Sequence, residues 1–312
     1  MQEKKLDFCP DSGANDSLQA NIISGEYDFE EAYVLAQKIF PFLKAYFRFE
    51  MEGRSNLPNC PFLMVGNHSG GLMCVDSYLL AAQYILWRQR PYLRFLVHDA
   101  LMLFSQLPIG KILRKGGAIR ADYAHAKKAL EAGFSVLVYP GGEKENNRPF
   151  SRRHEVDFFG HVGYVQLALE AQVPIVPVVS IGAHETLIIL GQLKVPSIAN
   201  QIAEILGLNT QGLEKFTPQT HPISITFPWG VSIGHLPFLP LPAQITIQIL
   251  PPIDISSYPP RAAQDPQIVG YIDRMVRGYL QAALDKLAKN RIPWIGKLES
   301  LNKWFFQKRA NN

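Results

Sequence analysis

Residues 62–76 read Phe-Leu-Met-Val-Gly-Asn-His-Ser-Gly-Gly-Leu-Met-Cys-Val-Asp, and this stretch decides how the chain folds around it. The apolar run at 62–65 is typical of a short buried strand. A strand that ends in Gly-Asn-His presents the imidazole of His68 at a sheet edge, where a substrate can reach it. Asp76 opens a second apolar segment, whose spacing predicts a helix with the carboxylate at its N-terminus. A histidine and a carboxylate joined by a glycine turn predict a general base, His68, and its orienting partner, Asp76.

The segments around this stretch alternate between strand-like and helix-like patterns. Apolar strands are expected at 61–66, 93–98, 134–139 and 174–180, and helices at 76–88, 99–106, 122–132 and 161–171. Such alternation is typical of βαβ units. The sequence therefore predicts an α/β fold, with a central, largely parallel (mixed) sheet flanked by helices and with amphipathic terminal helices.

Three regions follow from composition. Residues 1–27 are polar and predicted to be flexible. The main domain spans 28–290: it starts with a helix capped by Asp28 and includes alternating strands at 46–52 and 244–249. Its last helix runs from about Asp265 to Lys289. Within it, about 183–242 is predicted to be an insertion, mostly helical to residue 221 and then an apolar, proline-rich loop that frames an acyl tunnel or a membrane mouth.

The third region, 291–312, is a basic, aromatic tail. From residue 285 to the end, seven basic residues stand against two acidic ones, and the aromatic residues Trp294, Trp304, Phe305 and Phe306 are interleaved with them. This composition is typical of an amphipathic helix that lies on an anionic membrane surface. The alternative is a terminal helix docked on the domain.

Three later stretches complete a set of four blocks: Arg-Lys-Gly-Gly-Ala-Ile-Arg at 114–120, Val-Leu-Val-Tyr-Pro-Gly-Gly-Glu-Lys-Glu at 136–145, and Val-Pro-Ile-Val-Pro-Val-Val-Ser-Ile-Gly at 173–182. In order and rough spacing, the blocks resemble those of the glycerolipid (lysophosphatidate-type) acyltransferase superfamily over about residues 45–255. The Pro-Gly-Gly-x-x-Glu of the third block is closest in style to the mono- and diacylglycerol acyltransferase type 2 branch. The resemblance implies direct acyl transfer from acyl-CoA or an acyl carrier protein to a lipid hydroxyl, without a further cofactor and without an acyl-enzyme.

Two features depart from the family pattern. Seven residues separate His68 from Asp76 where the family has four, so the Gly70-Gly71 pair must widen the loop to restore the contact. The third block carries Gly141-Gly142-Glu143-Lys144 where lysophosphatidate enzymes have Glu-Gly-Thr-Arg. Lysine lacks the bidentate fork of arginine. This difference favours a neutral acceptor, such as diacylglycerol, and leaves lysophosphatidate as the alternative.

Further site residues follow from the same blocks. Backbone N–H groups of Ser69, Gly70 and Gly71, or of the Gly141-Gly142 turn, are predicted to stabilise the oxyanion of the tetrahedral intermediate. The predicted substrate-binding residues are Arg120, Gly141, Gly142, Glu143, Lys144 and Arg148, the cations among them through the phosphates of coenzyme A or of an acceptor.

Other functions are less well supported by the motifs. A Cys74 nucleophile is conceivable, but a cysteine between Met73 and Val75 is typically buried and inert. The potential ligands between His154 and His161 do not have metal-site spacing, so no metal is predicted. The chain has no GxSxG, GxGxxG or GxxxxGK[ST] motif, and its basic tail suits lipid at least as well as nucleic acid. A lipid esterase, a thioesterase and a catalytically silent lipid-binding protein remain as alternatives of another class.

The composition suits one large globular domain, because the 312 residues are 47% hydrophobic and 19% charged. The N-terminus lacks the apolar core of a signal peptide, and no run of 18 apolar residues predicts a spanning helix. We therefore expect a peripheral protein on the cytoplasmic face of a membrane, with acyl donor, lipid acceptor and membrane surface as partners and no nucleic acid.

Overall fold

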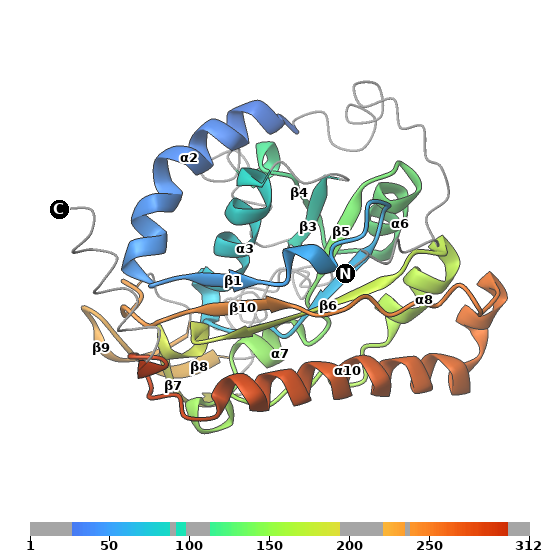
Figure 1. Cartoon of the computed structure of the whole chain (residues 1–312). Coiled ribbons are helices and arrows are strands. Elements are labelled where there is room, and N and C mark those ends of the chain that lie inside the picture. Colours follow the sequence, from blue (N-terminus) through green and yellow to red (C-terminus); the bar gives the residue numbers. More distant parts are fainter. Residues whose placement is uncertain (1–26, 88–91, 98–112, 194–220, 235–237, 299–312) are drawn as a thin grey trace, which may run out of the picture.

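The computed structural model describes residues 27–87, 92–97, 113–193, 221–234 and 238–298 (Figure 1). Seven strands of this part form one sheet in the order β1-β10-β6-β2-β5-β3-β4. β10 is antiparallel to β6, and the other neighbouring pairs are parallel. The predicted α/β fold with a largely parallel, mixed sheet is confirmed. The strands are β1 (Glu50–Glu52), β2 (Leu63–Gly66), β3 (Leu93–Val97), β4 (Ala118–Arg120), β5 (Ser135–Val138), β6 (Ile175–Ile181) and β10 (Thr246–Ile249).

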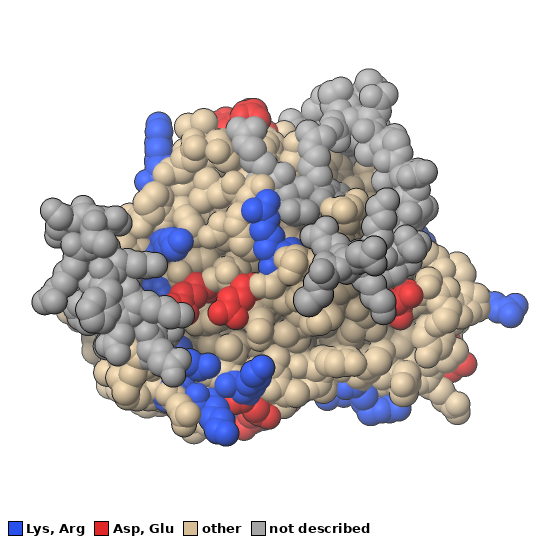
Figure 2. Space-filling model, in the orientation of Figure 1, with Lys and Arg blue, Asp and Glu red and all other residues tan. Residues whose placement is uncertain are grey.

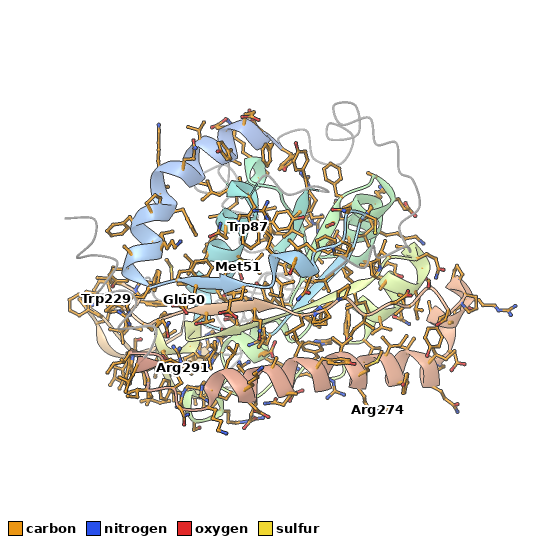
Figure 3. The ribbon with its side chains drawn as sticks, viewed as in Figure 1. Glu50, Met51, Trp87, Trp229, Arg274 and Arg291 are labelled. Carbon is orange, nitrogen blue, oxygen red and sulfur yellow. The ribbon has the colours of Figure 1, made fainter. Side chains whose placement is uncertain are left out.

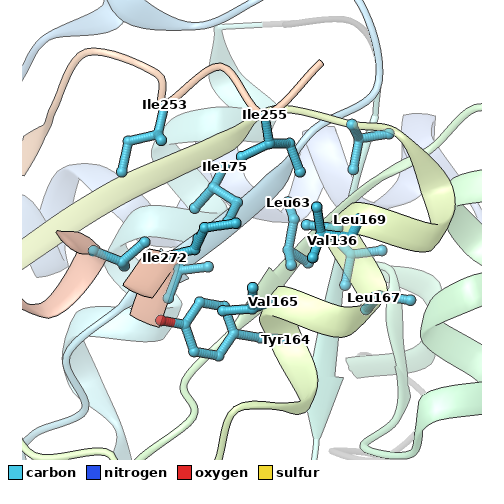
Figure 4. Close-up of a cluster of buried hydrophobic side chains, with 14 of the residues drawn as sticks. Leu63, Val136, Tyr164, Val165, Leu167, Leu169, Ile175, Ile253, Ile255 and Ile272 are labelled. Carbon is cyan, nitrogen blue, oxygen red and sulfur yellow. The ribbon is translucent and has the colours of Figure 1, made fainter. Parts of the chain in front are cut away.

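Helices cover both faces of the sheet. One face carries α6 (Tyr123–Glu131), α8 (Gly163–Ala171) and α10 (Pro266–Ala288), and the other carries α2 (Phe29–Tyr46) and α3 (Val75–Leu86). The alternation of side chains along a strand divides the core between these two layers. In β2, Leu63 and Val65 join the cluster under α8 and α10, drawn in Figure 4, whereas Met64 joins the cluster under α2 and α3.

The expected ends of the terminal helices agree with the structure. The Asp28 carboxylate accepts the Glu31 N–H at 3.0 Å and caps α2, and the Asp265 carboxylate caps α10. Pro41 lies inside α2, which continues to Tyr46. The helix expected at 99–106 lies outside the described residues. None of the described helices combines the length and apolarity needed to cross a bilayer.

The region expected to be a helical insertion contains a second, smaller sheet. Its strands are β7 (Ile188–Leu193), β8 (His221–Thr226) and β9 (Gly230–Ile233), antiparallel in the order β7-β8-β9. The helical prediction is wrong for 188–193, and the loop expected after residue 226 contains β9. β8 and β9 are short segments that contain or adjoin Pro222, Pro228 and Gly230, and these turn signals favour a loop over a strand. Trp229 lies at the outer end of this hairpin (Figure 3).

The described start of the predicted tail packs on the domain. The Arg291 guanidinium pairs with the Glu185 carboxylate at 2.8 Å, and both side chains are almost fully buried. The Trp294 N–H donates to the same carboxylate at 2.8 Å, and the Lys297 N–H donates to Gln244 Oε1 at 3.3 Å. Residues 291–297 therefore dock on the end of β6 and the start of β10, and residues 299–312 lie outside the described part.

Candidate active site

Three neighbouring parallel strands end at the same edge of the sheet. His68 follows β2, Tyr139 follows β5, and His184 follows β6 by three residues. Because β2 lies between β5 and β6, the three side chains lie around one point. The carboxyl ends of parallel strands are the usual place for a ligand site in open α/β sheets.

Asn67 holds the loop that follows β2 against the sheet. Its Nδ2 donates to the Ser180 carbonyl at 2.9 Å, and its Oδ1 accepts the Ser180 N–H at 2.8 Å. The buried side-chain amide thus extends the hydrogen-bonded pairing of β2 with β6 by one residue beyond the strand. Gly66 is required just before it, since a Cβ there would lie 2.7 Å from the ring of Tyr139. Sequence reasoning quoted Asn67 in the motif but gave it no role.

The long spacing between His68 and Asp76 is taken up by a compact turn. Gly70 and Gly71 have φ angles of 97° and 62°, which favour glycine, and Cys74 is left-handed at 41°. A short 3-10 helix, Gly71–Met73, lies between them and leads directly into α3. The Asn146 amide, from the helix α7 (Gly142–Asn146), donates to the Gly71 carbonyl at 2.7 Å and holds the turn against the third block.

The His68 imidazole is partly buried, and its low pKa keeps the ring neutral. It stacks on Tyr139, with ring centroids 4.5 Å apart, and its Nε2 lies 3.6 Å from the Cys74 sulfur. Its Nδ1 has no hydrogen-bond partner within the described residues. Burial, and then the charge of Arg148, lowers the pKa of His68 to about 3. Burial also raises the pKa of the Cys74 thiol to about 12, so the thiolate that a cysteine nucleophile needs is disfavoured.

Asp76 lies at the start of α3 as predicted, but its hydrogen bonds go to serines. Its Oδ2 accepts the Ser69 hydroxyl at 3.1 Å, and its Oδ1 accepts the Ser77 N–H at 2.8 Å. Burial raises the pKa of Asp76 to about 6 against these hydrogen bonds. The hydrogen bond expected between His68 and Asp76 is not formed among the described residues, so the role of Asp76 as orienting partner stays a prediction.

The main chain of His68 is held by a buried ion pair. The Glu145 Oε2 accepts the His68 N–H at 2.9 Å, and the Arg148 Nη1 donates to the His68 carbonyl at 3.0 Å. Glu145 and Arg148 also face each other at 3.4 Å. Burial raises the pKa of Glu145 to about 7, although the charge of Arg148 opposes this shift.

The predicted substrate-binding residues divide into three groups. Arg148 is buried and also donates to the Glu145 and Arg153 carbonyls, so in this structure it positions His68 and does not face a substrate phosphate. Gly142 and Glu143 line the cavity described below. Arg120 lies at the end of β4 with half of its side chain exposed, 3.9 Å from Asp122, and Lys144 lies over the Phe159 ring.

The two glycines of the third block are required for different reasons. A Cβ on Gly141 would lie 2.5 Å from the Cβ of Glu145 and 2.6 Å from the Asp157 carbonyl, so only glycine lets Glu145 reach His68. Gly142 has a φ of 53°, and its N–H donates to the Tyr139 carbonyl at 3.1 Å. The Gly142 N–H is therefore engaged and cannot serve as an oxyanion donor in this state.

His184 belongs to this site, although the sequence predictions above give it no role. Its Nδ1 accepts the Gly70 N–H at 3.3 Å, and its Nε2 donates to the Arg148 carbonyl at 2.9 Å. The buried ring therefore joins the loops that follow β2, β5 and β6. Burial, and then Arg148, lowers the pKa of His184 well below its ordinary value, which keeps the ring neutral. Its place directly after the fourth block was the signal in the sequence. Of the predicted oxyanion donors, the Gly70 N–H is thus engaged, and those of Ser69 and Gly71 stay predictions.

An apolar cavity of about 880 Å³ opens beside His68. α2 and α3 form one wall and the ends of β3, β4 and β5 another, and the lining includes Ile39, Phe40, Cys74, Tyr78, Phe95, Leu137, Tyr139 and Leu167. The volume lies within the range of roughly 300–1,000 Å³ that is usual for sites of drug-sized ligands. Almost all of the lining is hydrocarbon or aromatic, with His68 among its few polar groups. The described residues contain no group of three or more side chains that could hold a metal ion.

Residues 48–181 match the family model described as Acyltransferase. An uncharacterized protein of Mycobacterium tuberculosis is 30% identical over 251 residues, which are 80% of this chain and 64% of that protein, and one of Mycobacterium leprae is 30% identical over 80% and 63%. A Gallus gallus protein described as "DGAT1/2-independent enzyme synthesizing storage lipids" is 27% identical over 148 residues, 47% of this chain and 42% of that protein.

A solved structure, the 1-acyl-sn-glycerophosphate (LPA) acyltransferase PlsC from Thermotoga maritima, aligns with a TM-score of 0.47 and 15% identity over 81% of this chain and 79% of that chain. The chain spans about 64% of the length of the mycobacterial relatives. Residues 48–181, a little under half of the chain, are therefore similar to the acyltransferase family.

Proposed function

We propose that the protein transfers a fatty acyl chain from a thioester, acyl-CoA or an acyl carrier protein, to the hydroxyl of a neutral lipid such as diacylglycerol. The observation that carries this proposal is the neutral His68 imidazole in the wall of an apolar cavity of about 880 Å³. A lipid chain fits such a lining, and a neutral imidazole is the form that accepts a proton from a hydroxyl.

In the proposed reaction the acceptor hydroxyl donates its proton to His68 and its oxygen attacks the thioester carbonyl. The negative charge that develops beside the ring favours the imidazolium and raises the proton affinity of a group whose pKa is otherwise low. The tetrahedral intermediate then collapses, the C–S bond breaks, and His68 returns the proton to the thiolate. Asp76 would join this step only by exchanging its Ser69 hydrogen bond for one from His68 Nδ1.

The burial of Arg148 supports a neutral acceptor. Arg148 is buried against Glu145 and three backbone carbonyls, so it is not available to an acceptor phosphate. The similarity to the chicken enzyme named for storage-lipid synthesis points the same way. Membrane association follows from the proposal, because diacylglycerol and its products reside in a bilayer.

The test is an acyl-transfer assay with labelled palmitoyl-CoA and four acceptor conditions: diacylglycerol, a long-chain alcohol, lysophosphatidate and none. We expect product with the neutral acceptors, and loss of more than nine-tenths of it in a folded His68→Ala protein. Phosphatidate as the main product would replace the proposed acceptor with lysophosphatidate. Free palmitate alone, dependent on His68, would make the protein a hydrolase, and bound lipid without turnover would make it a binding protein.

A further inference from the structure

The β8–β9 hairpin has an inverted pattern of burial. Its inward-facing side chains are polar: Ser224, Thr226 and Ser232 are buried. Its outward-facing side chains are apolar, and Val231 and Ile233 are 70% and 62% exposed. A sheet with one solvated face normally turns its apolar residues to the core and its polar residues to water.

Hydrogen bonds among the buried hydroxyl groups stabilise this inverted arrangement. The Ser232 hydroxyl lies 3.3 Å from that of Ser224 and 3.1 Å from that of Thr226, so the buried hydroxyls satisfy one another. On the outer face, Ile225 lies opposite Val231 on β9 and opposite Ile188 on β7. Residues opposite each other point to the same side of a sheet, so these side chains form continuous apolar rows.

The apolar face continues beyond the hairpin to α2. The Leu239 N–H donates to the Phe227 carbonyl at 3.0 Å, and both side chains are more than half exposed. The next residue, Pro240, accepts the Tyr46 hydroxyl at 2.7 Å, and Tyr46 stacks with the exposed ring of Phe42. Figure 1 shows β9 and the C-terminal end of α2 at the same end of the molecule. These residues form a surface that we call the apolar apron: Ile225, Phe227, Val231, Ile233, Leu239 and Phe42.

The charges around the apron indicate what kind of partner would bind it. The sequence 216–253 contains no Lys, Arg, Asp or Glu, so the hairpin offers no charged group to a protein partner. Basic residues lie at its edges: Lys44 is exposed in the last turn of α2, and Lys and Arg side chains gather near the small sheet at the C-terminal end of α10 (Figure 2). The described part of the chain ends at Leu298, next to Lys297, whose N–H donates to Gln244 Oε1 at 3.3 Å. An uncharged apolar face with a cationic edge matches an anionic lipid bilayer.

We propose that the apolar apron is the surface through which this protein docks on an anionic bilayer, with the hairpin side chains among the acyl chains. The inference rests on the proposed function in one respect, since a lipid acceptor must come from that bilayer. β7 follows directly on the Ala183–Glu185 turn that holds His184, and the Leu187 side chain packs against Gly71. Docking there brings the lipid surface next to the catalytic loop.

The test compares vesicle binding of two double variants by cosedimentation with phosphatidylcholine vesicles that contain phosphatidylglycerol. Val231→Ser/Ile233→Ser removes the centre of the apron. The matched control, Tyr271→Ser/Tyr279→Ser, removes two residues of similar exposure on α10. We expect the apron variant to bind at least about tenfold more weakly and the control to bind like the parent protein. Circular dichroism and urea unfolding verify that both variants are folded.

A second measurement separates this proposal from the proposed function. Acyl transfer to a short-chain, water-soluble acceptor should be unchanged in the apron variant, whereas His68→Ala should bind vesicles normally and transfer nothing. The docking proposal is overturned if the parent protein does not bind vesicles, or if the folded apron variant binds as well as the parent protein. It is also overturned if light scattering shows a dimer that the apron substitutions dissociate, since the face is then a subunit interface. Vesicle binding without transfer would refute the proposed function alone.

Discussion

The Glu145 carboxylate holds the main chain of His68: its Oε2 accepts the His68 N–H at 2.9 Å, although 77 residues separate the two in sequence. The same carboxylate accepts the Asp157 N–H at 3.3 Å and faces Arg148, which donates to the His68 carbonyl. One buried ion pair therefore holds both the main-chain N–H and the carbonyl of His68. The position of the proposed base, His68, depends on the third block as much as on the strand that carries it.

Substituting Glu145 should therefore affect stability and activity together. In Glu145→Ala the Arg148 guanidinium remains buried without its carboxylate, and breaking a buried pair in this way costs about 3–5 kcal/mol. We expect a loss of that size in the free energy of unfolding by urea, and a large fall in kcat from the displaced His68. The control is Glu131→Gln at the exposed C-terminal end of α6, which should unfold like the parent protein. Equal stability of Glu145→Ala and the parent protein would contradict the clamp.

The buried Asp76 predicts an unusual dependence of stability on pH. Burial raises its pKa from 3.8 to about 6, so between these values the folded protein binds a proton that the unfolded chain does not. This carboxyl stabilises the folded protein at low pH, and that contribution is lost as the pH rises through about 6. A shift of about two pKa units corresponds to about 3 kcal/mol.

Urea unfolding of the parent protein and of Asp76→Asn, at pH 4 and pH 7, isolates this contribution from the other titrating groups. We expect the difference in unfolding free energy between the two proteins to change by about 2–3 kcal/mol between these pH values, with the parent protein relatively more stable at pH 4. A difference that stays constant with pH would show that the carboxyl has an ordinary pKa.

The fold was predictable where the apolar pattern decides it. The runs 62–65 and 174–180 are buried on both faces of the sheet, so they are apolar except for Ser180, and their strands were recognised. The same reasoning failed at β8 and β9, because both strands are short and Pro228 and Gly230, where the chain turns from one to the other, are typical of a loop. It placed His68 at the sheet edge but not its hydrogen-bond partners, because a seven-residue loop with two glycines can turn in many ways. It assigned Arg148 to substrate because a sequence shows a charge and does not show that the charge is buried.

Gly141 should be intolerant of even a methyl group. An alanine Cβ would lie 2.5 Å from the Glu145 Cβ and 2.6 Å from the Asp157 carbonyl, so the residues that hold His68 must move apart. Overpacking of this kind costs typically about 1–3 kcal/mol, and we expect Gly141→Ala to lose that stability and most of its acyl transfer. The control is Gly278→Ala in α10, where a Cβ meets nothing within 4 Å and helix propensity predicts a gain of about 0.5–1 kcal/mol. Thermal or urea unfolding of the two variants measures this difference in stability. A fully active Gly141→Ala protein would contradict the prediction.

His184 is expected to act on catalysis through the loop that it holds. Its Nδ1 accepts the Gly70 N–H and its Nε2 donates to the Arg148 carbonyl. The neutral ring therefore lies between the Gly70 turn and the residues that follow the third block. In His184→Ala two buried polar groups lose their partners, which costs about 1–3 kcal/mol each. The Gly70 turn is then free to shift, and with it the His68 ring that follows β2.

The diagnostic comparison is between His184→Ala and His184→Asn, because the Asn amide oxygen can accept the Gly70 N–H from nearly the position of the imidazole Nδ1. We expect kcat to fall about tenfold or more in the alanine protein, with KM for the thioester little changed, and to recover in part in the asparagine protein. Recovery by asparagine would separate positioning of the loop from a general loss of stability, since asparagine still leaves the Arg148 carbonyl without its donor. Equal kcat values in the two variants would show that the Gly70 contact does not position His68, and a rise in KM alone would place His184 in substrate binding.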